Sequence, residues 1–197
     1  MRIPCQVARL LADVAEREAE TIAVPMAVSI VDEEGGLLFF NRMDGALPVS
    51  TELAVSKAFT SAVLRMPTHE LGRLAQPGGE LYGIQETHRG RIVLFGGGLP
   101  LRLWGEPAGA VGVSGGTVAE DIRVAQPVVN ALEEMERQAA CIGDLPWPGR
   151  LEANSSARLL ERTLREEFGK LNGLVSREGI DLLVGGFLLA AFKRRLS

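Results

Sequence analysis

Histidine, cysteine and aromatic residues are all scarce in this chain of 197 residues, which contains two histidines, two cysteines and 5% aromatic residues. Cys5 and Cys141 lie far apart without CxxC spacing, so neither a zinc site nor a disulfide framework is indicated. His69 and His88 lack the spacing of a paired metal motif, and catalytic zinc therefore has no support. This cysteine usage fits a reducing compartment.

Long apolar segments are also missing. The most apolar stretch, residues 180–192, has 13 residues and contains Asp181, whereas a membrane-spanning helix needs about 20 apolar residues. The first residues do not show the apolar region of a signal peptide. We therefore expect a cytoplasmic protein with no transmembrane segment. A net charge of -4 also argues against a nucleic-acid partner, because such proteins neutralise phosphates with Lys and Arg.

Charge and proline content divide the chain into two parts. Residues 1–150 contain 13 Lys and Arg against 19 Asp and Glu, while residues 151–197 contain 8 against 6. Segment 143–150 carries two prolines and two glycines, which stop a helix and favour an extended linker. We predict a main domain over residues 1–142, a linker over residues 143–154 and a helical tail over residues 155–197.

The periodicity of the main domain predicts an α+β fold. Helices are expected from about residue 5 to residue 20, from Ser50 onwards with a small-residue stripe of Ala54, Ala58 and Ala62, and after a capping box at Thr117 and Glu120. Short apolar segments predict five strands, at residues 26–31, 37–40, 91–95, 99–104 and 108–113. Short turns between sequential strands favour antiparallel pairing. We therefore predict a five-stranded antiparallel sheet flanked by helices, with the helical tail as an extension.

Two glycine clusters are the first candidates for a binding site: Gly96, Gly97 and Gly98, and the stretch of residues 109–116. The second cluster ends at a predicted helix N-terminus, where Ser114, Gly115 and Gly116 could present N–H groups to a carboxylate or phosphate. Neither cluster matches a dinucleotide fingerprint or a P-loop. The alternative interpretation is structural, because glycines also serve turns and close helix–sheet contacts.

Charged residues and one histidine complete the set of candidates. Arg42, Asp44 and Lys57 could form a rim for the carboxylates of a ligand, or an ordinary cluster of ion pairs. His88 lies in a loop before an apolar segment, where binding residues are common, although a surface turn is the alternative. A single histidine can ligate haem iron. No catalytic motif is recognisable.

Six segments of the chain resemble a known family. They read VPMAVSIVDEEGG, NRMDGALPVS, SKAFTSAVLRMPT, LAQPGGELYG, GRIVLFGGGLPL and GAVGVSGGTVAED, in this order. Over about residues 5–140 the chain resembles the haem-binding family of GlcG, HbpS and the C-terminal domain of PduO-type proteins. The resemblance implies an α-β-α sandwich, self-assembly into dimers or larger rings, and tetrapyrrole binding, with haem degradation in some members. It also implies a link to bacterial microcompartments or cobalamin-dependent metabolism.

The resemblance implies that a set of loop residues forms the binding pocket of this chain: Arg42, Asp44, Gly96, Gly97, Gly98, Ser114, Gly115 and Gly116. Some members of the family use a histidine near the first helix as haem ligand, but residues 5–20 contain none. His88 is the candidate iron ligand, and Met26, Met43 or Cys5 could substitute for it.

Three functions follow as hypotheses. The preferred one is a haem-binding or small-molecule-binding accessory protein. The second is an enzyme that acts on haem or on a small oxygenated metabolite. The third is an interaction or cargo module that acts through its tail, which carries an apolar stripe from Leu160 to Leu171. This tail could pack on its own body or on a sister subunit. It could also dock on a shell or partner protein, or bind a membrane surface.

Overall fold

The computed structural model describes residues 3–143. Its elements, in chain order, are α1 (Cys5–Thr21), β1 (Ala27–Asp32), β2 (Leu37–Arg42), α2 (Pro48–Leu64), α3 (Thr68–Leu74), the 3-10 turns η1 (Ile84–Glu86) and η2 (His88–Gly90), β3 (Gly98–Leu103), β4 (Glu106–Ser114) and α4 (Val118–Gly143). The chain divides into two compact units, residues 1–133 and 134–197, and the fold below is that of the first unit. The predicted linker after residue 143 and the helical tail lie outside the described residues.

Four strands form one antiparallel sheet in the order β2-β1-β4-β3. The prediction of an antiparallel sheet is confirmed, but the count of five strands is wrong. Residues 91–95 do not join the sheet. Val93 instead donates its N–H to the hydroxyl of Thr60 on α2, at 3.0 Å, and the side chains of Ile92 and Val93 are buried. An apolar segment that packs on a helix has the same sequence pattern as a short buried strand.

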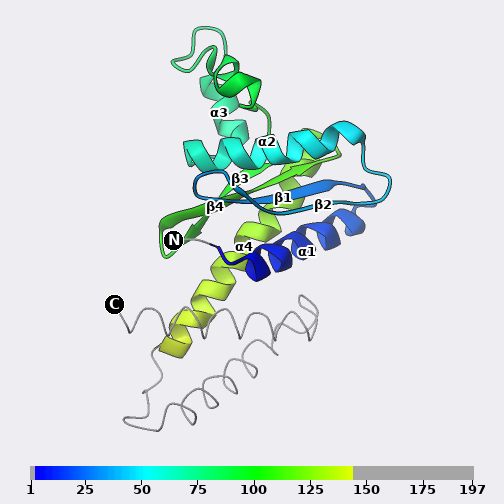
Figure 1. The fold of residues 1–197 in the computed structure, drawn as a ribbon, viewed down its shortest axis with the longest axis vertical. Helices are drawn as coiled ribbons and strands as arrows, with labels where there is room; N and C mark the ends of the chain where they lie inside the picture. Colours follow the sequence, from blue (N-terminus) through cyan, green and yellow to red (C-terminus); the bar gives the residue numbers. More distant parts are fainter. Residues whose placement is uncertain (1–2, 144–197) are drawn as a thin grey trace. The chain divides into compact units, whose positions relative to one another are not determined.

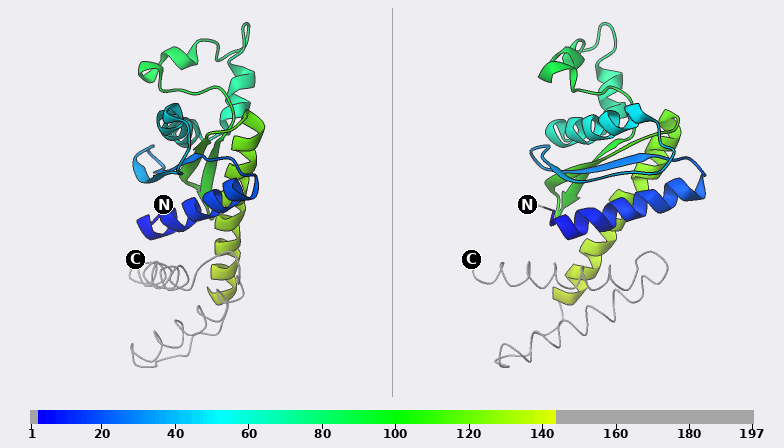
Figure 2. Two further views of the ribbon diagram at one scale, coloured as in Figure 1. Left: turned by 90° about the vertical axis from the view of Figure 1, so that its right-hand side faces the viewer. Right: turned by 45° about the vertical axis from the view of Figure 1, so that its right-hand side comes forward.

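Helices cover both faces of the sheet, as Figures 1 and 2 show. α2 lies along one face, over β4, β1 and β3, whereas α1 lies on the other face over β1 and β2. In Figure 2, α4 begins near the level of α2 and runs past the sheet towards α1, and its Arg123 forms an ion pair with Glu18 of α1 at 2.9 Å. The predicted α+β sandwich is therefore present.

The small-residue stripe of α2 allows an unusually close approach to the sheet. Ala54, Ala58 and Ala62 are buried, and a Cβ on Gly112 of β4 would lie 2.0 Å from the carbonyl oxygen of Ala54. Ala58 and Ala62 pack with Val31 and Ala110 in the core. Because any side chain at Gly112 would push α2 away, this glycine and the alanine stripe together set the spacing between the layers.

Candidate functional site

A buried ammonium group lies at the centre of the glycine clusters. The side chain of Lys57 on α2 has no exposed surface, and its Nζ donates to Asp121 Oδ2 of α4 at 2.5 Å. It also donates to the carbonyl oxygen of Val113 at 3.0 Å and lies 4.9 Å from the ring centre of Phe95. The three elements α2, β4 and α4 are therefore tied together by one charged group. We call Lys57, Asp121 and their contacts the buried ion-pair cluster.

The glycines at residues 96–98 make room for this cluster. A Cβ on Gly97 would lie 2.5 Å from the carbonyl oxygen of Val113 and 2.9 Å from Lys57 Nζ, and the positive φ of +113° also favours glycine. A Cβ on Gly98 would lie 2.5 Å from the carbonyl oxygen of Lys57. On Gly96 it would collide with Ile122 of α4. The lack of side chains in this first glycine cluster therefore allows close packing, and its role in ligand binding stays a prediction.

The second glycine cluster leads into the N-terminus of α4. Gly116 donates its N–H to Asp121 Oδ1 at 3.1 Å, and Thr117 donates its N–H to Glu120 Oε2 at 2.7 Å. Ser114 is buried in the sheet opposite Ala27. The predicted capping box is thus confirmed. The N–H groups of Gly116 and Thr117 already bind carboxylates of the chain itself, so an added anion would have to displace one of them.

Burial and hydrogen bonding shift two pKa values here. Burial lowers the pKa of Lys57, because desolvation disfavours its charged form, while the hydrogen bond and charge of Asp121 act in the opposite direction. The N–H and hydroxyl of Thr117 lower the pKa of Glu120 by stabilising its carboxylate. The sequence did not indicate Asp121, because its partner Lys57 lies 64 positions away along the chain.

The structure separates the three charged residues that were grouped as a rim. Arg42 at the end of β2 and Asp44 in the following turn are exposed. Lys57 points into the core and pairs with Asp121 instead, so it does not join them in a rim. The role of Arg42 and Asp44 in ligand binding stays a prediction.

His88 is exposed, and its Nδ1 lies 3.1 Å from the hydroxyl of Thr87. That hydroxyl donates to the carbonyl oxygen of Ile84 at 2.6 Å. This arrangement is compatible with the imidazole tautomer that donates from Nδ1 to the hydroxyl and leaves Nε2 without a proton. This is the form in which an imidazole binds a metal, with the other ring nitrogen held by a second group.

An aromatic ring and a guanidinium support the imidazole. The ring of Phe59 on α2 lies 5.9 Å from that of His88, centre to centre, and the guanidinium of Arg91 stacks over Phe59 at 3.8 Å. His88 and Arg89 both have positive φ, +51° and +60°. Two consecutive non-glycine residues in this region store strain, which often marks functional loops. We call residues 84–91 the His88 loop.

The other three candidates for an iron ligand are buried or already contact another group of the chain. Met26 is fully buried. Met43 is half-buried, and its sulfur accepts the N–H of Met26 at 3.4 Å. Cys5 is exposed, but its thiol lies 3.8 Å from the carbonyl oxygen of Leu38, which it contacts as a weak donor. Of the four candidates, His88 alone is an exposed imidazole.

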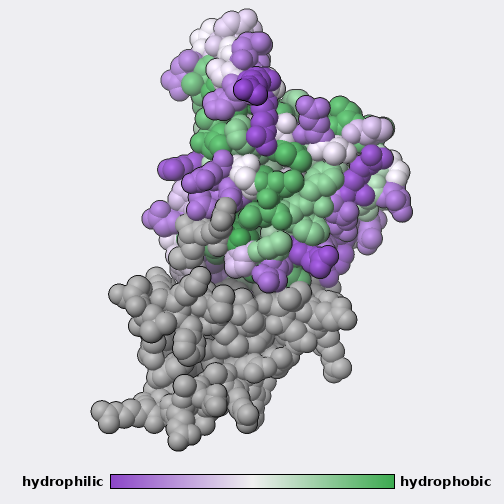
Figure 3. All heavy atoms as spheres, in the orientation of Figure 1, coloured by the Kyte–Doolittle hydropathy of each residue, from purple (hydrophilic) through white to green (hydrophobic). Residues whose placement is uncertain are grey.

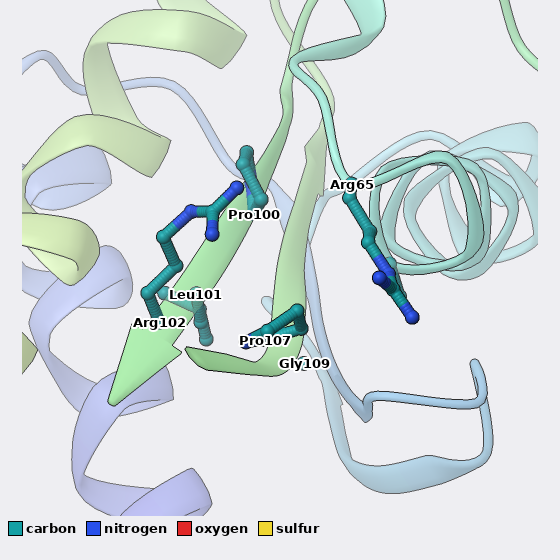
Figure 4. A pocket seen from close by; sticks show the side chains of 7 residues that line it. Arg65, Pro100, Leu101, Arg102, Pro107 and Gly109 are labelled. Atoms are coloured by element: carbon teal, nitrogen blue, oxygen red, sulfur yellow. The ribbon is translucent and has the colours of Figure 1, made fainter. Parts of the chain in front are cut away.

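A shallow depression of about 170 Å³ lies elsewhere, at the ends of β3 and β4 (Figure 4). It is open on one side and is lined by Arg65, Arg102, Pro100, Leu101, Pro107, Ala62 and Gly109. Gly109, at the start of the candidate stretch of residues 109–116, is among these lining residues. Among residues 3–143 there is also no cluster of three or more His, Cys, Asp or Glu side chains suited to a metal ion, and no helix long and apolar enough to cross a membrane.

Comparison with known proteins identifies the family. Residues 3–130 match the family described as haem degrading protein HbpS-like. The chain belongs to the HbpS-like family. The resemblance noted on the sequence is therefore confirmed. This HbpS-like chain also has curated relatives in Citrobacter freundii. An uncharacterized 15.0 kDa protein of the dhaT-dhaS intergenic region is 44% identical over 68% of the chain and 94% of the relative.

A second curated relative is the corrinoid adenosyltransferase PduO of Citrobacter freundii, 38% identical over 70% of this chain. The PduO of Salmonella typhimurium is 42% identical over 60% of this chain. The match spans 41% and 35% of the length of these two enzymes, respectively. Their likeness to this HbpS-like chain therefore concerns one part of each enzyme.

Solved structures share the fold of this HbpS-like chain. Klebsiella pneumoniae ORFY has a TM-score of 0.66 and 39% identity, over 68% of this chain and 92% of its own. The PduOC:heme complex has a TM-score of 0.64 and 39% identity, over 66% and 95%. A double mutant of Streptomyces reticuli HbpS has a TM-score of 0.61 and 30% identity, over 67% and 88%.

Proposed function

We propose that this HbpS-like protein binds haem and that His88 Nε2 is the ligand of the iron. The observation that carries the proposal is the chain of contacts from His88 Nδ1 through the hydroxyl of Thr87 to the carbonyl oxygen of Ile84, which is compatible with the tautomer that leaves Nε2 free to bind a metal. Histidine ligands of metals commonly hold their second ring nitrogen in this way. Haem supplies the iron to which a neutral imidazole can bind.

The surroundings of His88 fit a flat, dianionic ligand. Phe59 offers an aromatic surface next to the imidazole, and Arg89 and Arg91 place two cationic side chains in the same loop. Guanidinium groups bind carboxylates such as those of a porphyrin with two parallel hydrogen bonds. The match to the HbpS-like family and the fold shared with a PduOC:heme complex support the same ligand.

A titration of the full chain with hemin, followed by visible absorbance, tests the proposal. Wild-type protein should give a saturable Soret shift, and His88→Ala should abolish it. Adding imidazole to His88→Ala should restore a six-coordinate or five-coordinate histidine-type spectrum. His69→Ala is the matched control, because it removes the other histidine and should leave the titration unchanged. A saturable shift of equal midpoint in His88→Ala would exclude His88 as the ligand.

The hydroxyl of Thr87 gives a finer test of the same geometry. Thr87→Val keeps the shape of the side chain but removes the acceptor of Nδ1–H. Loss of such a supporting group typically weakens metal affinity by about 10–100-fold. Thr87→Ser keeps the hydroxyl and should bind hemin like the wild type. Equal affinity in Thr87→Val and Thr87→Ser would show that the hydrogen bond does not prepare the ligand.

Haem turnover is the second candidate function, because the family is described as haem degrading. Incubating the haem-loaded protein with a reductant in air tests it: loss of the Soret band faster than in His88→Ala would favour an enzyme. The remaining expectations are cytoplasmic or microcompartment location and a tail that contacts a shell or partner protein. Deleting residues 151–197 tests the tail, since localisation should change while hemin binding persists.

A further inference from the structure

The shallow depression of Figure 4 lies where the last turn of α2 meets the hairpin of β3 and β4. It has a volume of about 170 Å³, and no residue of the His88 loop lines it. Drug-sized ligands need pockets of about 300–1,000 Å³. Since one water molecule takes up about 30 Å³, the depression suits a ligand of about six heavy atoms. It is therefore too small for a porphyrin.

The register of the sheet places the side chain of Arg102 on the side of α2. Ala110 of β4 is paired with Pro100 of β3, and it packs with Ala62 of α2. Paired residues in a sheet point to the same face, and so do alternate residues of one strand. Arg102 therefore shares the face of Pro100, which is the face that α2 covers.

A β-bulge supports this arrangement. The register of β3 and β4 shifts between Leu101 and Arg102, so that Arg102 pairs with Pro107. Bulges of this kind re-aim side chains and are common next to binding sites. Pro107 and Pro100 both line the depression. Because proline rings are rigid, these two walls keep their shape without a ligand.

Arg65 reaches the depression from the end of α2 in a strained conformation. It is the C-terminal cap of this helix, with φ 58° and ψ 31°. The residue in this left-handed region at a helix end is usually glycine, and sometimes asparagine. The backbone alone therefore favours glycine at position 65. Strain of this kind clusters at ligand-binding sites.

The charges around the depression have one sign. Its lining contains Arg65 and Arg102 and no acidic residue. Both arginines are exposed, and within residues 3–143 no ion pair joins either of them to a carboxylate. Arg102 Nη1 donates to the carbonyl oxygen of Gly105 at 3.0 Å, which holds this guanidinium in place. On the left of Figure 3, hydrophilic residues gather where α2 ends and where the β3–β4 hairpin turns.

We propose that Arg65 and Arg102 bind a phosphate group in this depression, which we call the arginine depression. A guanidinium donates two parallel hydrogen bonds to a pair of oxygens. One carboxylate has only two oxygens and saturates one guanidinium, whereas a phosphate group has three strong acceptor oxygens. In Figure 4 the two arginines lie on opposite sides of the arginine depression, so an anion between them needs this larger number of acceptors.

Isothermal titration calorimetry of the haem-free full chain, in a phosphate-free buffer of low salt, tests the proposal. Inorganic phosphate should bind saturably to the wild type. Arg102→Ala should weaken binding by about ten-fold to a hundred-fold, because it removes charged hydrogen bonds. Arg102→Lys keeps the charge but not the fork and should recover only part of the affinity. Arg73→Ala is the matched control, since Arg73 is an exposed arginine of α3 outside the depression.

Arg65→Gly separates binding from folding. Glycine relieves the left-handed strain, so the melting temperature of this variant should equal or exceed that of the wild type. Its phosphate affinity should nevertheless fall as it does in Arg102→Ala. His88→Ala should bind phosphate like the wild type, so this result does not depend on the haem proposal.

The choice of anion completes the test. Inorganic phosphate and glycerol phosphate are the two phosphate probes, and the tighter one identifies the source of the phosphate group. Saturable binding that is lost in Arg65→Gly and Arg102→Ala but kept in Arg73→Ala supports the proposal. Four results would overturn it: no saturable binding to the wild type, unchanged binding in either variant of the arginine depression, equal loss in Arg73→Ala, or succinate binding as tightly as phosphate.

Discussion

Two positions on α2, only two residues apart, face opposite environments. Lys57 points into the core and forms the buried ion-pair cluster, whereas Phe59 is half-buried and contacts the ring of His88. Residues two apart on a helix lie on different faces, because each residue turns the helix by about 100°. The cluster is buried and has its hydrogen bonds satisfied, while the loop is exposed and strained. Stability and ligand binding should therefore respond to different substitutions.

The largest effect is expected from Asp121→Ala. It would leave the ammonium of Lys57 buried without its carboxylate, and breaking a buried ion pair in this way costs about 3–5 kcal/mol. Urea denaturation should show this loss in the free energy of unfolding. The double variant Lys57→Met/Asp121→Leu replaces both charges by apolar groups and should be more stable than Asp121→Ala. If it is not, the ion pair is not what makes the single variant unstable.

The second largest effect on stability is expected from Gly97→Ala. Its Cβ would collide with the carbonyl oxygen of Val113, and a positive φ adds strain. Gly105→Ala is the matched control, since Gly105 also has a positive φ of +79° but nothing within 4 Å of the new Cβ. Gly97→Ala should lower the free energy of unfolding by about 1–3 kcal/mol more than Gly105→Ala, as overpacking does. Equal losses in thermal denaturation would mean that crowding at the cluster is unimportant.

A smaller effect is expected at the cap of α4. Thr117→Ala removes the side chain of the N-terminal cap, which typically costs about 1 kcal/mol. Because the folded state lowers the pKa of Glu120 below its usual 4.5, the contribution of its carboxylate is complete above that value and is lost as the pH falls through the lowered pKa. The difference in stability between wild type and Thr117→Ala should therefore shrink in acid. A constant difference across this pH range would contradict the coupling of the two groups.

The smallest effect on stability is expected at His88, where the effect on binding is largest. His88→Ala should change the free energy of unfolding by no more than about 0.5 kcal/mol, because the side chain is exposed. Differential scanning calorimetry without ligand measures this, and the hemin titration measures the binding. A strongly destabilised His88→Ala would remove the contrast between the loop and the cluster, and would make the loss of hemin binding uninformative.

Local patterns predicted a large part of the fold correctly. The sequence predicted the apolar segments that form β1, β2, β3 and β4. It also predicted the alanine stripe of α2 and the capping box of α4. Each depends on residues close together in the chain, which is why it could be read there. Residues 91–95 were misassigned because burial against a helix and burial in a sheet leave the same apolar pattern.

The candidate site could be predicted from the sequence only in part. His88 was named from its position in a loop, and the contact of its Nδ1 with Thr87 is local. Its support by Phe59 depends on how the loop folds back onto α2. Lys57 was predicted to lie in a rim with Arg42 and Asp44, but it is buried. The residues next to it in the sequence do not show this burial.

The sequence by itself determined the elements of this protein, its antiparallel class and its family, since periodicity, capping and turn residues act over short distances along the chain. Only the tertiary structure decided that Lys57 meets Asp121, 64 positions away, and that Gly97 and Gly98 lie against Lys57. The physical reason is that burying a charge without an opposite charge costs several kcal/mol, so Lys57 needs a partner. The folded chain decides which residue lies close enough to be that partner.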